Sequence, residues 1–234
     1  MNPVIVTDPP RADLDQVTRL AGFGVATVHE ALGRSGLLSA GLRPIQDGAR
    51  VGGTAVTALC WPGDNLMIHA AVEQCREGDL LVVTTTSPCR DGLFGELFAT
   101  ALRRRGVRGL VTTTGVRDVA ELRALGFPVW SAAISAQGTV KATAGAVNVP
   151  VVVGGQLVRP GDAVLADDDG VLCVRREDVR SGLGKAQARL EKEAAAREAF
   201  ANGQLGLDRY GLREKLEALG VRYLTAEEYA KEQA

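Results

Sequence analysis

The middle of the chain alternates between short apolar runs and amphipathic segments. The run DLLVVTTT at 79–86 is rich in β-branched residues, which is typical of a strand buried on both faces. Within 94–105, apolar residues recur at i, i+3, i+4, i+7 and i+8, the spacing of one helical face. A second strand at 109–115, a second helix at 118–126 and a third strand at 127–134 follow. This order of elements predicts two right-handed crossovers and a parallel sheet.

The pattern before and after this unit predicts further elements of the same domain. On the N-terminal side, we expect one helix over 13–33 with Asp13 as its cap, a strand over 51–60 and a helix over 65–76. After Lys141, short strands follow one another through glycine and aspartate turns, with no helix between them. The pattern therefore indicates an α/β fold with a mixed sheet or a barrel-like closure.

The C-terminal part of the chain is rich in alanine and in charged residues. Residues 183–203 have a strong amphipathic helical pattern, and 206–224 predict another helix and a tail. We expect a catalytic α/β domain over 1–182 and a C-terminal helical arm over 183–234. An arm of this length and composition is expected to pack on a neighbouring subunit.

Composition and charge argue against several classes of protein. With 46% apolar residues, the chain has too much apolar material for intrinsic disorder. Its 27 basic and 28 acidic side chains give a net charge of −1, which argues against a dominant basic surface for nucleic acid. The sequence has neither an apolar run near the roughly 18 residues of a membrane span nor a secretory signal pattern. We expect a cytoplasmic protein with no nucleic-acid or membrane partner.

The histidine and cysteine content limits the metal chemistry. The four cysteines are widely spaced without a CxxC pair, so we expect free and mostly buried thiols. Two histidines cannot form a three-histidine zinc centre. Carboxylates and waters would have to hold any metal, which favours a hard ion such as Mg²⁺ or Mn²⁺.

Two predicted helix starts lie where ligands bind in parallel sheets. The motifs of phosphate loops, dinucleotide-binding folds, serine hydrolases and zincins are absent. One crossover separates the start at Gly95 and Glu96 from the start at Arg117 and Asp118, so both are expected at one sheet edge. Backbone amides there can bind an anion, Arg117 a carboxylate, and the two acids a divalent ion. The alternatives are two structural helix caps and a surface ion pair.

A polar line on the predicted helix at 65–76 is a second candidate. Asn65, His69 and Glu73 recur at i, i+4 and i+8, so they share one helical face. They could contact a polar substrate, with His69 as a proton-transfer group, or form a hydrated rim. Lys141, just past the third strand, could be an anion ligand or a solvated lysine.

The segment GELFATALRRRGVRGLVTTTGVRDVAEL carries an acid, twenty intervening residues and then Arg-Asp. It closely resembles the signature of the metal-dependent 4-hydroxy-4-methyl-2-oxoglutarate / 4-carboxy-4-hydroxy-2-oxoadipate aldolases. These are class II pyruvate aldolases that also decarboxylate oxaloacetate. The likeness extends to NLMIHAAVEQCREGDLLVV and VNVPVVVGGQLVRPGDAVLADDDGV, and so covers most of the chain. Shorter relatives of the same fold, the regulators of ribonuclease E activity, lack the C-terminal arm, which favours the aldolase interpretation.

The resemblance implies a layered α/β sandwich with a central barrel-like mixed sheet and a C-terminal helical arm, assembled as trimers or hexamers with sites between subunits. It implies Asp118 as the direct ligand of the metal and Arg117 as the residue that binds the pyruvoyl carboxylate. Glu96 matches a second acid that reaches the metal through water, a position where the family usually has Asp. In the arm, Glu193 matches a glutamate donated across the subunit interface, with Glu191 as the alternative in register.

The resemblance also implies residues that bind the two ends of the substrate. The backbone amides of the turn hold the pyruvoyl carboxylate, and three further residues contact the distal carboxylate-bearing end. The turn consists of Gly95, Glu96, Leu97 and Phe98, and the distal residues are Asn65, His69 and Lys141.

The expected function is retro-aldol cleavage of an oxo-acid to pyruvate plus pyruvate or oxaloacetate, in the catabolism of aromatic compounds. Oxaloacetate decarboxylation is the expected side activity, Mg²⁺ the expected cofactor and Mn²⁺ the alternative. The choice between the methyl and the carboxymethyl substrate stays open at this point. The competing hypothesis is a non-catalytic regulator that acts on a ribonuclease through protein contact.

Overall fold

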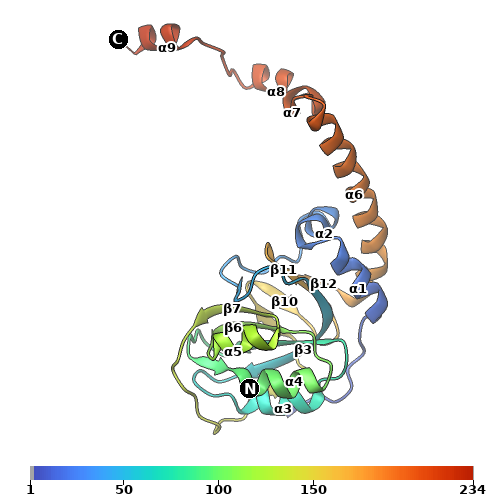
Figure 1. The fold of residues 1–234 in the computed structure, drawn as a ribbon, viewed down its shortest axis with the longest axis vertical. Coiled ribbons are helices and arrows are strands. Elements are labelled where there is room, and N and C mark those ends of the chain that lie inside the picture. The colour runs from blue at the N-terminus through green and yellow to red at the C-terminus, as the bar shows by residue number, and fades with distance from the viewer. Residues whose placement is uncertain (1–2, 234) are drawn as a thin grey trace. The chain divides into compact units, whose positions relative to one another are not determined.

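Four parallel strands form the centre of a large mixed sheet (Figure 1), and they include all three strands of the predicted βαβαβ unit. The computed structural model describes residues 3–233. The strands are β3 (Val51–Cys60), β4 (Asp79–Thr85), β6 (Leu110–Val116) and β7 (Val129–Ile134), in that spatial order. The helices between them are α3 (Leu66–Gln74), α4 (Glu96–Arg104) and α5 (Val119–Leu125). The predicted parallel sheet is therefore confirmed.

Shorter strands make the sheet mixed, as the glycine- and aspartate-rich turns predicted. Within the described residues the sheet has ten strands, and a separate pair forms a two-stranded hairpin. The added strands are β1 (Val4–Ile5), β2 (Arg43–Pro44), β5 (Gly92–Phe94), β8 (Ala146–Val147), β11 (Ala163–Asp167) and β12 (Gly170–Val174), and the hairpin is β9 (Val151–Val153) with β10 (Gln156–Val158). β11 pairs antiparallel with β3, and β5 pairs parallel with β6. The short β5, which the sequence pattern did not predict, leads directly into α4.

Alternate side chains of β4 lie in two different cores, because successive side chains of a strand point to opposite faces. Leu81 and Val83 pack in the core that contains residues of α3, α4 and α5, the helices that cover this face in Figure 1. Leu80 and Val82 pack with Trp130 and with the β9–β10 hairpin on the other face. Burial on both faces explains the uninterrupted apolar run at 80–83 in the centre of the strand.

The predicted helix over 13–33 is wrong as a single element, because it is divided into α1 (Leu14–Gly22) and α2 (Val25–Ala31). Asp13 caps α1 as predicted, accepting a hydrogen bond from the Gln16 amide at 2.9 Å. Between the helices, Gly24 has φ of 86°, a left-handed conformation that glycine tolerates. The Asp167 carboxylate accepts a hydrogen bond from the Val25 amide at 2.8 Å, so a distant turn caps the second helix.

The chain divides into two compact units, Met1–Arg189 and Leu190–Ala234. Helix α6 (Val179–Ala201) follows a 3₁₀ turn, η1 (Arg176–Asp178), and begins four residues before the start predicted from the sequence. Its first turns bury Val179, Gly182 and Ala186, of which Val179 and Ala186 belong to a third core with residues of α1, α2, β11 and β12. These burials place the start of α6 in the N-terminal unit.

The C-terminal unit contains the end of α6 and three short helices, where the sequence predicted one helix and a tail. The helices are α7 (Gly206–Arg209), α8 (Leu212–Ala218) and α9 (Ala226–Glu232). A capping box between Thr225 and Glu228 begins α9. None of the described residues from 190 onward is buried.

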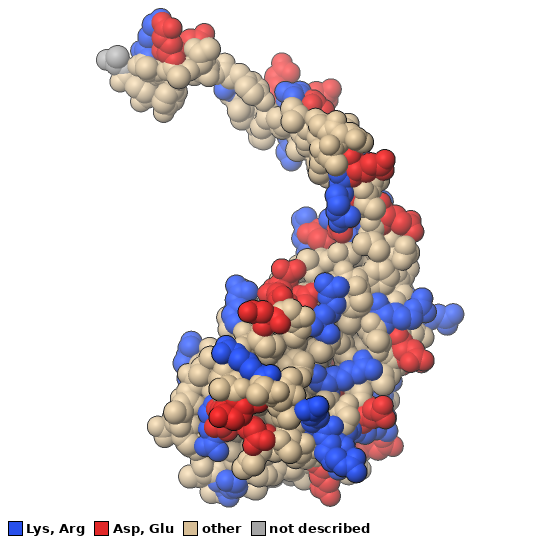
Figure 2. Space-filling model, in the orientation of Figure 1, with Lys and Arg blue, Asp and Glu red and all other residues tan. Residues whose placement is uncertain are grey.

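Charged side chains of both signs are interspersed over the face of the N-terminal unit that Figure 2 shows. This distribution agrees with the nearly balanced totals of 27 basic and 28 acidic residues. Within residues 3–233, none of the helices combines the length and the apolar character that crossing a membrane requires.

Candidate active site

A pocket of about 210 Å³ lies beside the starts of α3, α4 and α5, where the parallel strands end. Its walls come from α3, α4, the β6–α5 junction and the loop after β7. The lining residues are Asn65, His69, Val72, Gly95, Leu97, Phe98, Ala101, Arg117, Asp118 and Lys141. The pocket therefore brings together residues from all the segments that the sequence singled out in the N-terminal unit.

Arg117 and Asp118 occupy the junction between β6 and α5. The Arg117 amide donates to the carbonyl of Phe94 at 2.9 Å, which ties this junction to β5. Asp118 has φ of 54°, a left-handed conformation that costs a residue with a β-carbon on the order of 1 kcal/mol. Its carboxylate lies 3.7 Å from Arg117 Nε, and both side chains are close to half exposed. The junction therefore presents an accessible guanidinium and an accessible carboxylate side by side.

Gly95 allows the close approach of α4 to this ion pair. A Cβ on Gly95 would lie 2.2 Å from Asp118 Oδ2 and 3.1 Å from Arg117 Cγ. Any side chain at this position would displace the Asp118 carboxylate, so glycine lets α4 begin this close to the ion pair. The next amide, of Glu96, donates to Asp118 Oδ2 at 3.1 Å.

The Glu96 side chain does not line the pocket. Its Oε1 accepts a hydrogen bond from the Thr100 hydroxyl at 2.5 Å, one turn further along α4. Glu96 thus contacts Asp118 through its backbone amide, and its role as a second acid that reaches a metal through water stays a prediction. The sequence spacing is consistent with the contact to Thr100, because side chains four residues apart are neighbours on a helix.

Asn65 and His69 lie on the α3 side of the pocket. Asn65 is 5% exposed, and its Nδ2 donates to the carbonyl of Leu93 at 3.1 Å. This hydrogen bond fixes the orientation of the side-chain amide. The amide oxygen of Asn65 is buried and has no hydrogen-bond partner among the described residues. Because its amide nitrogen is already engaged, Asn65 holds α3 against β5.

His69 packs against Phe98 with a ring-centroid distance of 4.5 Å. Burial, together with the nearby charge of Lys141, lowers the pKa of His69 from its ordinary value. His69 is therefore mainly neutral at pH 7 and can donate or accept a hydrogen bond. Glu73, the third member of the polar line, is exposed and does not line the pocket.

Lys141 reaches the pocket from the loop between β7 and β8. A buried carboxylate, Asp64, accepts hydrogen bonds from the amides of Ala142 and Thr143 directly after it. Sequence reasoning missed Asp64. The sequence does contain an indication of this role, because Asp64 stands just before a predicted helix start, where a side chain can accept backbone hydrogen bonds.

Asp118 is the residue of this pocket that fits a divalent ion. Within the described chain there is no group of three or more His, Cys, Asp or Glu side chains that could hold a metal. Mg²⁺ usually keeps several waters and needs only one or two protein carboxylates. The accessible carboxylate of Asp118, beside amides of a helix start, meets that requirement.

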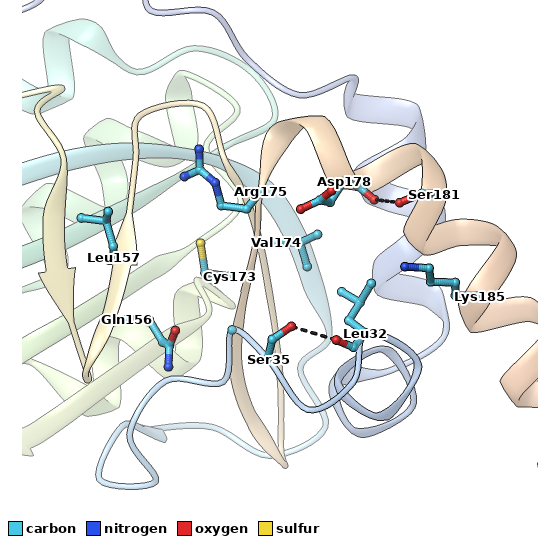
Figure 3. A pocket seen from close by; sticks show the side chains of 11 residues that line it. Leu32, Ser35, Gln156, Leu157, Cys173, Val174, Arg175, Asp178, Ser181 and Lys185 are labelled. Atoms are coloured by element: carbon cyan, nitrogen blue, oxygen red, sulfur yellow. Dashed lines mark hydrogen bonds between the residues drawn. The ribbon is translucent and has the colours of Figure 1, made fainter.

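Figure 3 shows a second cavity, of about 310 Å³, between the turn after α2, the β9–β10 hairpin, the end of β12 and the start of α6. Its arginine, Arg175, is engaged by Asp162 at 2.6 Å and by Glu177 at 3.2 Å. Burial raises the pKa of Cys173 to about 12, so this thiol stays protonated and is a poor nucleophile. Although larger, this cavity is the weaker candidate for a reaction site.

A family model described as RraA-like, Aldolase/RraA, matches residues 25–173. This range is more than half of the chain and contains every residue that lines the smaller pocket. The chain belongs to the Aldolase/RraA family. The predicted family is thereby confirmed, together with the mixed α/β fold.

Curated relatives of this Aldolase/RraA chain carry provisional names. A protein of Halalkalibacterium halodurans, provisionally named 4-hydroxy-4-methyl-2-oxoglutarate aldolase, is 26% identical over 200 residues, which cover 86% of this chain and 95% of the relative. A protein of Burkholderia multivorans with the same provisional name is 37% identical over 142 residues, 61% of this chain and 86% of the relative. These names support a lyase at the level of the family.

Solved structures of Aldolase/RraA proteins include inhibitors of RNA processing. RraAS2 of Streptomyces coelicolor, described as an unusual member of the RNase ES inhibitor RraA protein family, has a TM-score of 0.72 and 28% identity. The comparison covers 81% of this chain and 99% of RraAS2. The RNA-processing inhibitor RraA from Thermus thermophilis has a TM-score of 0.58 over 64% of this chain and 90% of its own. The fold thus carries two kinds of described function.

Proposed function

We propose that this protein is a divalent-metal-dependent carbon–carbon lyase. It cleaves 4-hydroxy-4-methyl-2-oxoglutarate or 4-carboxy-4-hydroxy-2-oxoadipate to pyruvate plus pyruvate or oxaloacetate, and it decarboxylates oxaloacetate as a side reaction. Its place is in the catabolism of aromatic compounds, whose cleavage supplies such oxo-acids. The observation that supports this proposal is a pocket with two cations, Arg117 and Lys141, on separate elements beside the single carboxylate of Asp118. Such a pocket suits a substrate that carries more than one carboxylate.

Each end of the substrate has its own binding groups in this proposal. The planar guanidinium of Arg117 binds the C1 carboxylate in a forked pair of hydrogen bonds. The first-turn amides of Leu97 and Phe98, which lie at the N-terminus of α4, donate to the same carboxylate. Lys141 and the neutral His69 bind the distal carboxylate.

The reaction breaks the bond between C3 and C4. A base removes the proton of the C4 hydroxyl, the C4 oxygen forms a carbonyl, and the electron pair of the C3–C4 bond passes to C3. Arg117 stabilises the negative charge of the resulting pyruvate enolate, and protonation at C3 completes the first pyruvate. Loss of carbon dioxide from oxaloacetate leaves the same enolate, so one pocket serves both reactions.

Asp118 would hold the divalent ion, with waters in the remaining positions. When bound, Mg²⁺ or Mn²⁺ supplies Lewis-acid polarisation of the C2 carbonyl. The proton relay involves Glu96 or a glutamate of a neighbouring subunit. Glu96 lies next to the pocket, but its carboxylate must first leave the Thr100 hydroxyl.

A homo-oligomer, trimer or hexamer, would supply the second glutamate. Glu193, or Glu191 two residues before it, lies on α6 in the C-terminal unit, outside the unit that contains the pocket. That unit exposes large apolar side chains, including Phe200 at 41%, Leu219 at 69% and Tyr223 at 73%. Their exposure supports contact with another copy of the chain. Size-exclusion chromatography with light scattering distinguishes trimer, hexamer and monomer.

A regulator of ribonuclease activity is the second candidate, and the descriptions of RraAS2 and of the Thermus protein favour it. This alternative predicts no metal-dependent turnover and direct binding to a ribonuclease. The C-terminal unit and the accessible ion pair in the pocket favour the lyase.

Pyruvate release, coupled to lactate dehydrogenase, tests the proposal. The substrates are 4-hydroxy-4-methyl-2-oxoglutarate and oxaloacetate, each with Mg²⁺ or EDTA and with an enzyme-free Mg²⁺ control. We expect Mg²⁺-dependent release from both, and its loss in Asp118→Ala with the circular dichroism unchanged. Release from oxaloacetate alone contradicts the aldol substrate, and no enzyme-dependent release from either contradicts the lyase. Normal activity of Asp118→Ala contradicts its assigned role.

A further inference from the structure

The loop that carries Lys141 has little regular structure of its own. Between the end of β7 and the start of β8, residues 135–145 form only one isolated bridge, at Val140. Lys141 itself is exposed. A lysine on such a loop needs other contacts to hold its ammonium group at the pocket, because its four-carbon side chain has high conformational entropy.

Asp64 supplies these contacts from the segment just before α3, which is bridged to Val140. It is 2% exposed and stands directly before Asn65, at the start of α3. Its Oδ2 accepts hydrogen bonds from the amides of Ala142 at 2.8 Å and Thr143 at 2.7 Å. Its Oδ1 accepts the Leu66 amide at 2.8 Å. One carboxylate therefore joins the residues just after Lys141 to the first turn of α3.

Backbone hydrogen bonds hold the residue before Lys141 to the same segment. The Val140 amide donates to the carbonyl of Gly63 at 2.9 Å, and the Asn65 amide donates to the carbonyl of Val140 at 3.0 Å. Lys141 thus has an anchor on each side, and the Asp64 side chain makes the anchor on its C-terminal side.

The carboxylate of Asp64 is ionised at neutral pH despite its burial. Burial alone raises the pKa of Asp64, but hydrogen bonds from Leu66, Ala142 and Thr143 outweigh it and lower the pKa below its ordinary value. An ionised carboxylate accepts hydrogen bonds and donates none, which matches the three amide donors around it. An uncharged side chain at this position would hold the loop less firmly.

We propose that Asp64 is a positioning residue that holds Lys141 at the distal end of the pocket, where Lys141 binds the far carboxylate of the oxo-acid. This inference rests on the proposed function, and it assigns that function's specificity for the distal group to a residue that does not touch the substrate. It makes the loop after β7 and the start of α3 one binding element.

The main variant is Asp64→Ala, compared with Lys141→Met and with the double variant. We expect Asp64→Ala to raise the KM for 4-hydroxy-4-methyl-2-oxoglutarate roughly tenfold, the scale of one lost hydrogen bond to a charged group, with a smaller change in kcat. Lys141→Met should raise KM by a similar factor. Because Asp64 acts through Lys141, the double variant should show no further increase.

Asp162→Ala is the matched control. Asp162 is also 2% exposed, and its carboxylate accepts two backbone amides, of Arg159 at 3.0 Å and Arg176 at 3.1 Å, neither of which belongs to the loop that carries Lys141. The control should lose stability while KM stays at the wild-type value. An equal increase in KM in both alanine variants would assign the effect to general destabilisation and overturn the proposal.

The proton resonances of His69 give a second readout that needs no turnover. The chain has two histidines, so the titrations in EDTA are resolved by NMR and assigned with a His29 substitution. The charged groups that share the pocket with His69 are Lys141, Arg117 and Asp118. Lys141→Met should raise the pKa of His69, because one cause of its lowered value is removed. Asp64→Ala should move it in the same direction, and Asp162→Ala should not.

Asp64→Asn covers the case in which Asp64→Ala does not fold. It keeps the side-chain volume, but its NH₂ group must face at least one of the three amide donors, so a smaller rise in KM and in the His69 pKa is expected. Wild-type values of both in a folded Asp64 variant overturn the inference, as does a further KM increase in the Lys141→Met background. If the wild-type protein releases no pyruvate, the proposed function fails, while the His69 titration still tests whether Asp64 positions Lys141.

Discussion

Gly95 is the position where one added methyl group most directly disturbs the candidate site. Gly95→Ala places a Cβ 2.2 Å from Asp118 Oδ2 and 3.1 Å from Arg117 Cγ. The backbone itself accepts alanine, because φ at Gly95 is −152°. The predicted effect is therefore a steric displacement of the ion pair, without backbone strain.

The size of the displacement follows from the contact distance. Carbon and oxygen atoms that are not bonded normally stay more than about 3 Å apart, so the Asp118 carboxylate or the start of α4 must move by roughly 1 Å. A misplacement of about 1 Å in a reacting site can lower the rate on the order of a hundredfold. Overpacking of this kind costs about 1–3 kcal/mol of stability, which most folded domains can lose.

Pyruvate release and thermal unfolding measure the two effects separately. We expect kcat/KM of Gly95→Ala to fall by about two orders of magnitude, while the variant stays folded at 25 °C. Gly22→Ala is the control, because a Cβ at Gly22, the last residue of α1, meets nothing within 4 Å. A folded Gly95→Ala variant with wild-type kcat/KM would refute the reasoning that this close approach positions Asp118.

Three further predictions follow. Arg117→Lys should lower kcat/KM about a hundredfold, because lysine cannot form the forked pair with a carboxylate; an unchanged value contradicts carboxylate binding. Cys89, the half-buried thiol, should react first with a thiol reagent at pH 8 by mass spectrometry, because burial raises the pKa of the other three cysteines to about 12. Asp64 should stabilise the fold above its ordinary pKa of 3.8 and lose this contribution as the pH falls through its lowered value in the folded state. Denaturant unfolding of Asp64→Asn from pH 7 to pH 3 should therefore show a weaker pH dependence than the wild type.

The sequence alone was sufficient for the central sheet and for the placement of Arg117 and Asp118. The strands β4, β6 and β7 are rich in apolar and β-branched residues and are mostly buried, so local composition predicts them. The apolar spacing of α4 predicts a helix but not its buried side, because Leu97 and Ala101 are exposed beside the pocket while Ala99 is buried. Because ligands bind at the carboxyl ends of parallel strands, the β6–α5 junction was expected at the site. The structure brings it to the pocket beside α4.

Contacts between segments far apart in the sequence determine the break between α1 and α2 and the position of the Lys141 loop. No local sequence pattern contains these contacts. At the break between α1 and α2, the amide of Val25 donates a hydrogen bond to Asp167, which lies 142 residues away in the sequence. The loop of Lys141 is held by Asp64, 78 residues from the amide of Ala142. A hydrogen bond of this kind exists only after the sheet has brought the two segments together. Residue type therefore indicated which groups can do chemistry, and the tertiary fold decided which groups position them.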